Sequence, residues 1–252
     1  CPLVLPDPLD PGPLPLQGNL VSGEDHLFHG YGHINPIDRE VTISTASMCI
    51  FIRTSSTIVE ANSVLCLSSC FSGWSGVLVN LSDIAAMGGR PLALVNSVWS
   101  GGADSLQPLL EGMRFACNRF GVPMVGGHSN QQSPYTALSV AVLGVAEGPV
   151  LSARAAAPGD ELWMLMNQRG EFHRNYPFWD AATQSTPARL RSHLSLLPAL
   201  AAEGLVRAAK DISMGGLTGT AVMFAEACGL QLRIDLDAVE RPDGMEEQAW
   251  LT

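Results

Sequence analysis

Basic residues are scarce in this chain of 252 residues, and only one of them, Lys210, is a lysine. The 14 lysine and arginine residues form no cluster, and the 24 acidic residues bring the formal net charge to −10. Proteins that bind nucleic acids or anionic lipids usually carry a basic patch, so we expect neither kind of partner. A phosphorylated ligand bound upstream of Lys210 would need a metal ion or backbone amides in place of a lysine.

Long apolar runs are also missing, since no stretch of about 18 residues is free of polar interruption. The N-terminus, "CPLVLPDPLDPGPLP", lacks the basic start of a signal peptide. The six cysteines show neither a CxxC pair nor a repeated spacing, which indicates a reducing compartment. We therefore predict a cytoplasmic protein without a membrane span. Because the chain begins with Cys1 and not with methionine, we interpret it as a fragment or an irregular gene model.

The composition divides the chain into three stretches. Residues 1–45 are rich in proline, with six prolines among the first fifteen positions, and we predict an atypical or poorly ordered segment there. Residues 46–148 alternate between apolar strands and helices, and residues 151–252 form a second domain after the linker "EGPVLSARAAAPGD". Within the first domain, residues 46–72 are rich in serine and cysteine, with two predicted strands near residues 48–53 and 63–68.

Apolar spacing after Gly73 predicts an amphipathic helix at residues 73–88, which Gly88 ends and Pro91 prevents from continuing. The same reasoning predicts the remaining elements, which are helices at 104–120 and 187–202 and strands at 92–99, 122–129, 137–148, 161–167 and 230–236. The fold class is therefore α/β, with a mixed sheet flanked by helices in the first domain.

Asn80 and Asp83 are the first candidate site residues, in "VNLSDIAAMGGRP". On a helix they lie side by side at its edge, while the apolar residues face the core. Such a pair suits Mg²⁺, because hard cations take oxygen ligands and one carboxylate commonly shares the ion with substrate phosphates. A solvated helix face is the commoner explanation of an isolated pair of this kind. We expect the pair outside the apolar core.

Two glycine motifs are further candidates. In "VGGHS", Gly126 and Gly127 allow the backbone to approach a ligand closely, and His128 follows them directly. In "KDISMGGLTGT", Asp211 or Ser213 could cap a helix whose glycine-rich start could bind phosphate or a carboxylate. Taken alone, the first motif could be a plain glycine turn, and the second could serve close helix packing.

Together the three motifs, in this order, resemble the PurM-like superfamily of ATP-dependent enzymes. That superfamily includes aminoimidazole ribonucleotide (AIR) synthetase, selenophosphate synthetase and thiamine monophosphate kinase. The resemblance runs from about Gly73 to Trp250, and "YPFWDAAT" resembles an uncharacterised branch described as AIR synthase-related.

The resemblance implies a two-domain α/β (α+β) architecture, in which the N-terminal domain pairs with a second copy to form a homodimer and the C-terminal domain is incomplete here. It implies ATP and Mg²⁺ as cofactors and phosphoryl transfer to a small-molecule substrate. By the same resemblance, Asp83 is a metal ligand and Asn80 its neighbour. The resemblance assigns the glycine motifs to the nucleotide or substrate sites through Gly126, Gly127, His128, Asp211, Gly215 and Gly216.

One departure from the superfamily leaves alternatives open. Its members carry further aspartates before the helix of Asp83, whereas "VTISTASMCIF" and "SVLCLSSCFSG" contain no acidic residue here. The sequence upstream of Gly73 could be misread, or the chain could be an inactive dimerising or ligand-binding module. A third alternative is a metal site at His26, His29 and His33, although no cysteine or acidic side chain completes a tetrahedral set nearby.

Overall fold

The structure is a computed structural model. It describes the backbone of residues 28–29, 32–36, 41–42, 57–59, 68–173, 178–212 and 215–251, with side chains from Cys70 onward. The predicted strand at 48–53 lies outside these residues, as does most of the predicted strand at 63–68. Within the described ranges, no helix is long and apolar enough to cross a membrane.

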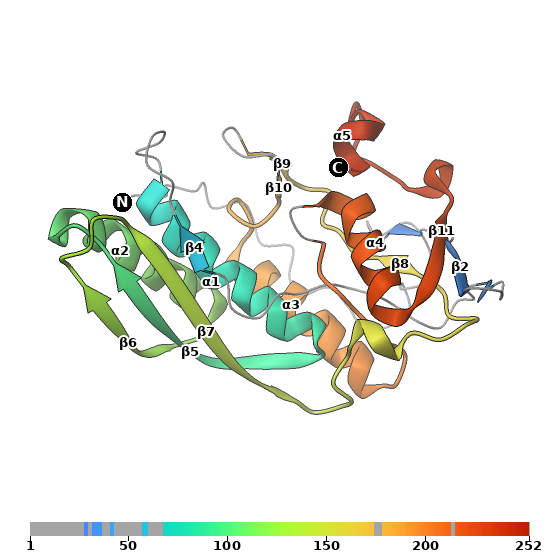
Figure 1. Ribbon diagram of the computed structural model, residues 1–252, viewed down its shortest axis with the longest axis horizontal. Helices are drawn as coiled ribbons and strands as arrows, with labels where there is room; N and C mark the ends of the chain where they lie inside the picture. Colours follow the sequence, from blue (N-terminus) through green and yellow to red (C-terminus); the bar gives the residue numbers. More distant parts are fainter. Residues whose placement is uncertain are drawn as a thin grey trace.

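A four-stranded mixed sheet organises the first half of the molecule (Figure 1). Its centre is the antiparallel pair β5 (Gly89–Trp99) and β7 (Ala137–Ala146). At one edge, β6 (Met124–Asn130) runs parallel to β5, and at the other edge β4 (Thr57–Val59) runs antiparallel to β7. The parallel pair is joined through a helix, as a parallel connection requires.

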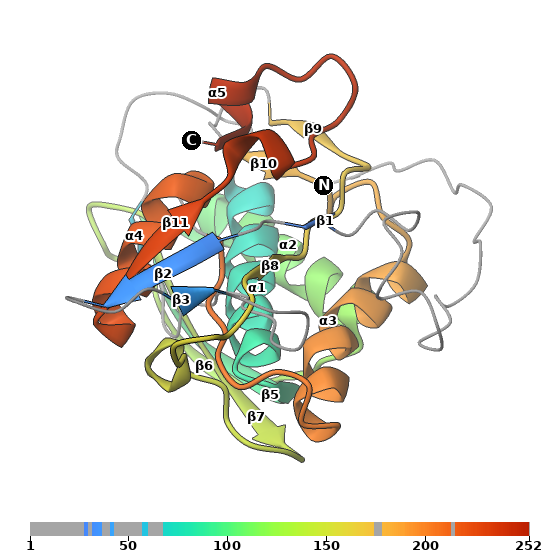
Figure 2. The same cartoon turned by 90° about the vertical axis from the view of Figure 1, so that its right-hand side faces the viewer.

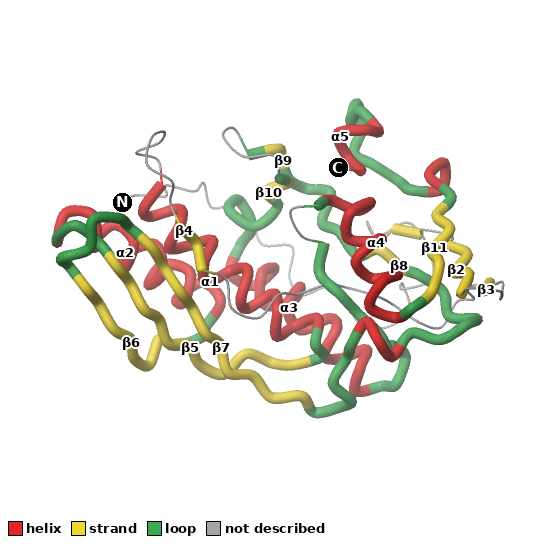
Figure 3. The backbone as a smooth tube through the Cα atoms, in the orientation of Figure 1, coloured by secondary structure: helices red, strands yellow, loops and turns green. Residues whose placement is uncertain are grey.

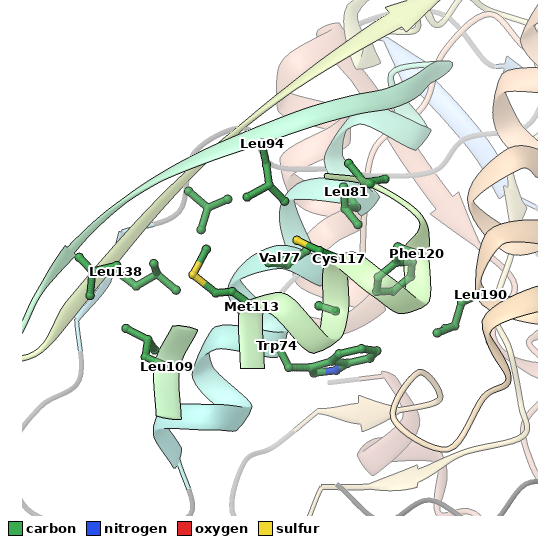
Figure 4. Packing of buried hydrophobic residues seen from close by; sticks show 14 of the residues in the cluster. Trp74, Val77, Leu81, Leu94, Leu109, Met113, Cys117, Phe120, Leu138 and Leu190 are labelled. Carbon is green, nitrogen blue, oxygen red and sulfur yellow. The ribbon is translucent and has the colours of Figure 1, made fainter. Parts of the chain in front are cut away.

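Two helices, α1 (Ser68–Ala86) and α2 (Ala103–Phe120), cover one face of this sheet (Figure 3). The main core lies between them and the strands, and Figure 4 shows how its side chains converge. The largest fully buried side chains there are Trp74, Leu81, Leu94, Leu109, Met113 and Leu138. Because α1 also contacts α3 (Pro187–Ala202) of the second half, it is buried on most of its sides.

Short strands and helices form the second half, which faces the viewer in Figure 2. Two small sheets tie early strands to it, the pair β1–β8 and the sheet β11–β2–β3, while a further pair, β9–β10, lies within the second half itself. The elements are β1 (Phe28–His29), β2 (Gly32–Pro36), β3 (Val41–Thr42), η1 (Ala153–Ala155), β8 (Trp163–Met164), β9 (Glu171–Phe172), β10 (Trp179–Asp180), α3 (Pro187–Ala202), α4 (Gly216–Cys228), β11 (Leu230–Ile234), η2 (Leu236–Ala238) and α5 (Glu247–Leu251).

Helix α3 joins the two halves. Its Leu190 belongs to the core of the first half and lies near Phe120 of α2, as Figure 4 shows. Its Leu197 and Leu200 pack instead with Ala86 of α1 and with Trp163 of β8. The second half therefore helps to complete the first core.

Most predicted elements are confirmed, with some corrections. The prediction for α3 matches its bounds, and those for α2, β5, β6 and β7 are close. The predicted start of α1 at residue 73 is wrong, because the helix begins at Ser68, where packing against α2 outweighs the weak helix propensity of serine. The predicted strand at 161–167 shrinks to the two residues of β8.

Candidate functional site

Asn80 and Asp83 both lie on α1, as predicted, but the expectation that they lie outside the buried interior is wrong. Each side chain is only 2% exposed, because α1 is covered by α2, α3 and the sheet. Asn80 Nδ2 donates a hydrogen bond to the carbonyl oxygen of Gly76, one turn earlier, at 2.7 Å. The pair is therefore a buried polar group beside the core, and not a solvated helix face.

The described residues do not complete a metal site. No group of three His, Cys, Asp or Glu side chains in this part of the chain could hold an ion. Asp83 belongs to no such group among the described residues, and its assignment as a metal ligand stays a prediction. Of the alternative histidine site, His29 and His33 lie on β1 and β2, which are described by backbone only, and His26 lies outside the described residues.

The first glycine motif forms the edge strand β6, which is exposed over almost its whole length. The two glycines face opposite sides of the sheet. A Cβ at Gly126 would meet only Val95 Cγ1, at 3.9 Å, whereas a Cβ at Gly127 would lie 2.7 Å from Asn96 Oδ1. The contact with Asn96 therefore explains why position 127 is a glycine. No atom of the described chain other than Val95 lies near the Cβ position of residue 126, so that space is free. His128 pairs in register with Ser97, on the same side as Gly126.

No described element covers the side of the sheet that carries Gly126 and His128 (Figure 1). Val95 of β5 is 44% exposed, and Leu143 of β7 is 66% exposed. Ala141 pairs with Val95 and is exposed as well. We call this side the outer face. Contiguous exposed apolar surface on a folded protein commonly marks a binding surface.

The second glycine motif leads into α4 in the other half. Lys210 Nζ and Asp211 Oδ1 form an ion pair at 3.2 Å, with both side chains mostly buried. The prediction that Asp211 caps the helix is wrong, because α4 begins at Gly216 with Gly215 as N-cap and no side-chain cap. Gly216 has a φ of 62°, a conformation that glycine adopts without strain. Ser213, the other predicted cap, lies outside the described residues.

A single chain does not bring the predicted site residues together. Figure 1 shows β6 and α4 toward opposite ends of the long axis, with α1 between them. Asn80 and Asp83 of α1 are buried, whereas Gly126 and His128 are exposed on the outer face.

Asn96 is a site residue that sequence reasoning missed. It is a buried amide in the middle of β5, between the core residues Leu94 and Val98. Its Nδ2 donates to Met124 Sδ of β6 at 2.8 Å. The only signal in the sequence is a polar residue in the apolar run "LALVNSVW", which does not reveal the partner across the strand.

The fold and the order of the three motifs indicate which protein family the chain belongs to. The chain belongs to the family of AIR synthase related proteins: residues 52–146 match the family's N-terminal domain, and residues 158–252 match its C-terminal domain. This places it in the PurM-like superfamily and confirms the predicted fold class.

Among individual relatives, an uncharacterised protein of Synechocystis sp. is 45% identical over 192 residues, which cover 76% of this chain and 59% of the relative. A selenide, water dikinase of Trichlorobacter lovleyi is 34% identical over 178 residues, covering 67% of this chain and 51% of that protein. The chain thus spans between half and three fifths of the length of these relatives.

The solved structure of T. maritima PurL complexed with ATP resembles this fold with a TM-score of 0.51 at 17% sequence identity. The match covers 88% of this chain and 36% of PurL. At this identity the likeness supports the fold.

Proposed function

We propose that this chain is the nucleotide-binding part of an ATP-dependent enzyme that transfers a phosphoryl group to a small-molecule substrate. The observation that carries the proposal is the open space at Gly126 on the exposed strand β6, beside His128. Family membership supports it, because one relative is named a selenide, water dikinase and one structural neighbour is PurL complexed with ATP. The substrate itself is not specified by these names.

In the proposed reaction, a nucleophilic atom of the substrate forms a bond to the γ-phosphorus of ATP. The bond from that phosphorus to the β,γ-bridging oxygen breaks, and ADP leaves with the electron pair. Such a transfer depends mainly on positioning and on neutralising phosphate charge. Mg²⁺ enters in this proposal with ATP, as the MgATP substrate complex. We assign Gly126 the close approach of the nucleotide and His128 a contact at its edge.

The proposal includes a homodimer formed through the outer face. Val95 and Leu143 expose apolar surface there, and pairing two copies would remove that surface from water. A second copy would also provide a way for the start of α4 to approach β6, which lies far from it within one chain (Figure 1). The inactive-module alternative predicts the same dimer without MgATP binding.

Gly126→Val tests the proposal directly. A Cβ at position 126 would meet only Val95, at 3.9 Å, so we expect the variant to fold normally. We expect its affinity for MgATP, measured by calorimetric titration, to fall by about tenfold or more, equivalent to about 1.4 kcal/mol. Binding is the better readout than turnover, because the chain spans only part of its relatives.

Gly101→Ala is the matched control. A Cβ there would meet only the carbonyl oxygen of Ser133, at 3.6 Å, and the residue lies outside β6. It should bind MgATP like the parent chain. If the parent chain binds no MgATP, or if Gly126→Val binds as tightly as the parent, the proposed function is wrong.

A further inference from the structure

Strand β6 contains a bulge that decides which side chains reach the outer face. Met124 pairs with Leu94 of β5, but the next pair is Gly126 with Val95, so β6 has one extra residue, Val125, at this point. Before the bulge, the even-numbered residue Met124 faces the core, whereas after the bulge the odd-numbered residue Gly127 does. A bulge of this kind re-aims the side chains that follow it.

The shift is visible on both faces. Met124 packs against the main core, and the next core-facing position of β6 is Gly127, whose Cβ direction points at Asn96. Without the extra residue, positions 124, 126 and 128 would share the core-facing side, because side chains alternate along a strand. The bulge therefore places Gly126 and His128 on the outer face.

Asn96 contacts β6 on both sides of the bulge. Its Nδ2 donates to Met124 Sδ at 2.8 Å, before the bulge. After the bulge, its side chain occupies the space where a Cβ at Gly127 would be, with Oδ1, Cγ and Nδ2 all within 2.8 Å of that position. Only a glycine at position 127 accommodates this arrangement.

Burying the side-chain amide of Asn96 at this position costs free energy. Asn96 is 9% exposed and lies on β5 between Leu94 and Val98, each of which is 1% exposed. A thioether sulfur is a weak acceptor, so the bond to Met124 compensates only part of the cost of burying the amide. A leucine here would bury apolar surface without that cost, which indicates that the amide serves another purpose.

We propose that Asn96 is a positioning residue that holds the β6 bulge and so keeps Gly126 and His128 on the outer face. Its consequence for nucleotide binding rests on the proposed function. Asn96 itself faces the core and does not touch the nucleotide in this account. It acts through the register of the strand.

Asn96→Leu tests this positioning, because leucine keeps the branching at Cγ but cannot donate a hydrogen bond. We expect the histidine ring resonances of His128 to shift in NMR spectra. We also expect the amides of residues 124–130 to exchange at least about tenfold faster, the factor that corresponds to one lost buried hydrogen bond. The matched control is Val98→Ala, a core-facing substitution two positions along β5. It lowers global stability but should leave the His128 resonances unchanged.

A double-mutant cycle tests the contact with Gly127. Gly127→Ala places a methyl group against the Asn96 side chain, so we expect it to accelerate β6 exchange by tenfold or more. In the Asn96→Ala background the space is free, and the same substitution should change β6 exchange by less than about threefold. Equal effects in both backgrounds would overturn the proposal.

These readouts separate the two proposals. If the parent chain binds no MgATP, the proposed function fails, while the His128 resonances and β6 exchange still decide whether Asn96 holds the bulge. If the parent chain binds MgATP and Asn96→Leu binds it equally well, Asn96 does not position the site. Unchanged His128 resonances in Asn96→Leu would overturn the inference irrespective of nucleotide binding.

Discussion

Gly73 of α1 lies directly against the backbone of Leu109 in α2, so that a Cβ at position 73 would be 2.1 Å from the Leu109 carbonyl oxygen. The two helices that build the main core cross here without any side chain between them. Because the obstructing atom is backbone, the helices themselves would have to move to admit a methyl group. We therefore expect Gly73→Ala to lower the free energy of unfolding by about 2 kcal/mol or more, measured by urea denaturation.

Gly219→Ala provides the contrast for this prediction. Gly219 lies inside α4, and a Cβ there would meet no atom within 4 Å. Alanine favours the helix over glycine, so we expect Gly219→Ala to raise the free energy of unfolding by about 0.5–1 kcal/mol. A Gly73→Ala variant as stable as the parent would show that the close crossing of α1 and α2 is absent in solution.

Stability should also depend on the protonation of His193 in α3. Burial, and then the positive charges of Arg189 and Arg169, hold the pKa of His193 below the 6.5 of a free imidazole. Above pH 6.5 the ring is neutral in both the folded and the unfolded chain. As the pH falls below 6.5, the unfolded chain binds a proton that the folded chain does not, so the free energy of unfolding decreases until the folded pKa is reached.

Two variants isolate this contribution. His193→Gln should be less sensitive to acid than the parent chain, as judged from urea denaturation at a series of pH values between 7.5 and 5. Arg189→Gln removes one of the two named positive charges, so the pKa of His193 should rise toward its ordinary value in NMR titration. A parent chain and a His193→Gln variant with parallel pH profiles would contradict the assignment.

The start of α3 should depend on its cap. The Thr186 hydroxyl accepts a hydrogen bond from the backbone N–H of Arg189 at 3.3 Å, and Pro187 occupies the first helical position. Thr186→Ala should therefore lower the free energy of unfolding by about 1 kcal/mol, as for other N-cap residues. Ser152→Ala, at the cap of the three-residue element η1, should cost less in the same chemical denaturation measurement, because few residues depend on that cap.

The bounds of α3 could be predicted because its signals are local. A threonine cap followed by proline marks its beginning, and the apolar spacing of Leu190, Leu194 and Leu197 continues from there. The mixed sheet could be predicted from runs such as "ALSVAVLGVA" for the same reason. These signals allow helix bounds and strands to be predicted because the residues that produce them are neighbours in sequence.

The burial of Asp83 and the contact between Asn96 and Gly127 could not be predicted in this way. Asp83 is buried because α3, more than a hundred residues later, packs on α1 with α2 and the sheet. Gly127 was predicted to approach a ligand, but its Cβ position is filled by an amide from the neighbouring strand. Both depend on tertiary packing, which helical or strand periodicity does not encode.

Leu143 offers the sharpest test of how the outer face is used. It is 66% exposed on that face, on the central strand β7, and pairs in register with Ala93 of β5. If two copies pair through this face, Leu143→Glu would place a carboxylate in an apolar interface, and burying an unpaired charge is strongly unfavourable. We expect the variant to be monomeric in light scattering at protein concentrations where the parent chain is dimeric, and to unfold at a similar urea concentration once both are monomeric.

Val222→Glu is the matched control, because Val222 is 58% exposed on α4, away from the sheet, and its substitution should leave the dimer intact. A parent chain that is monomeric at all accessible concentrations, or a Leu143→Glu variant that still forms the dimer, would show that the outer face does not join two copies.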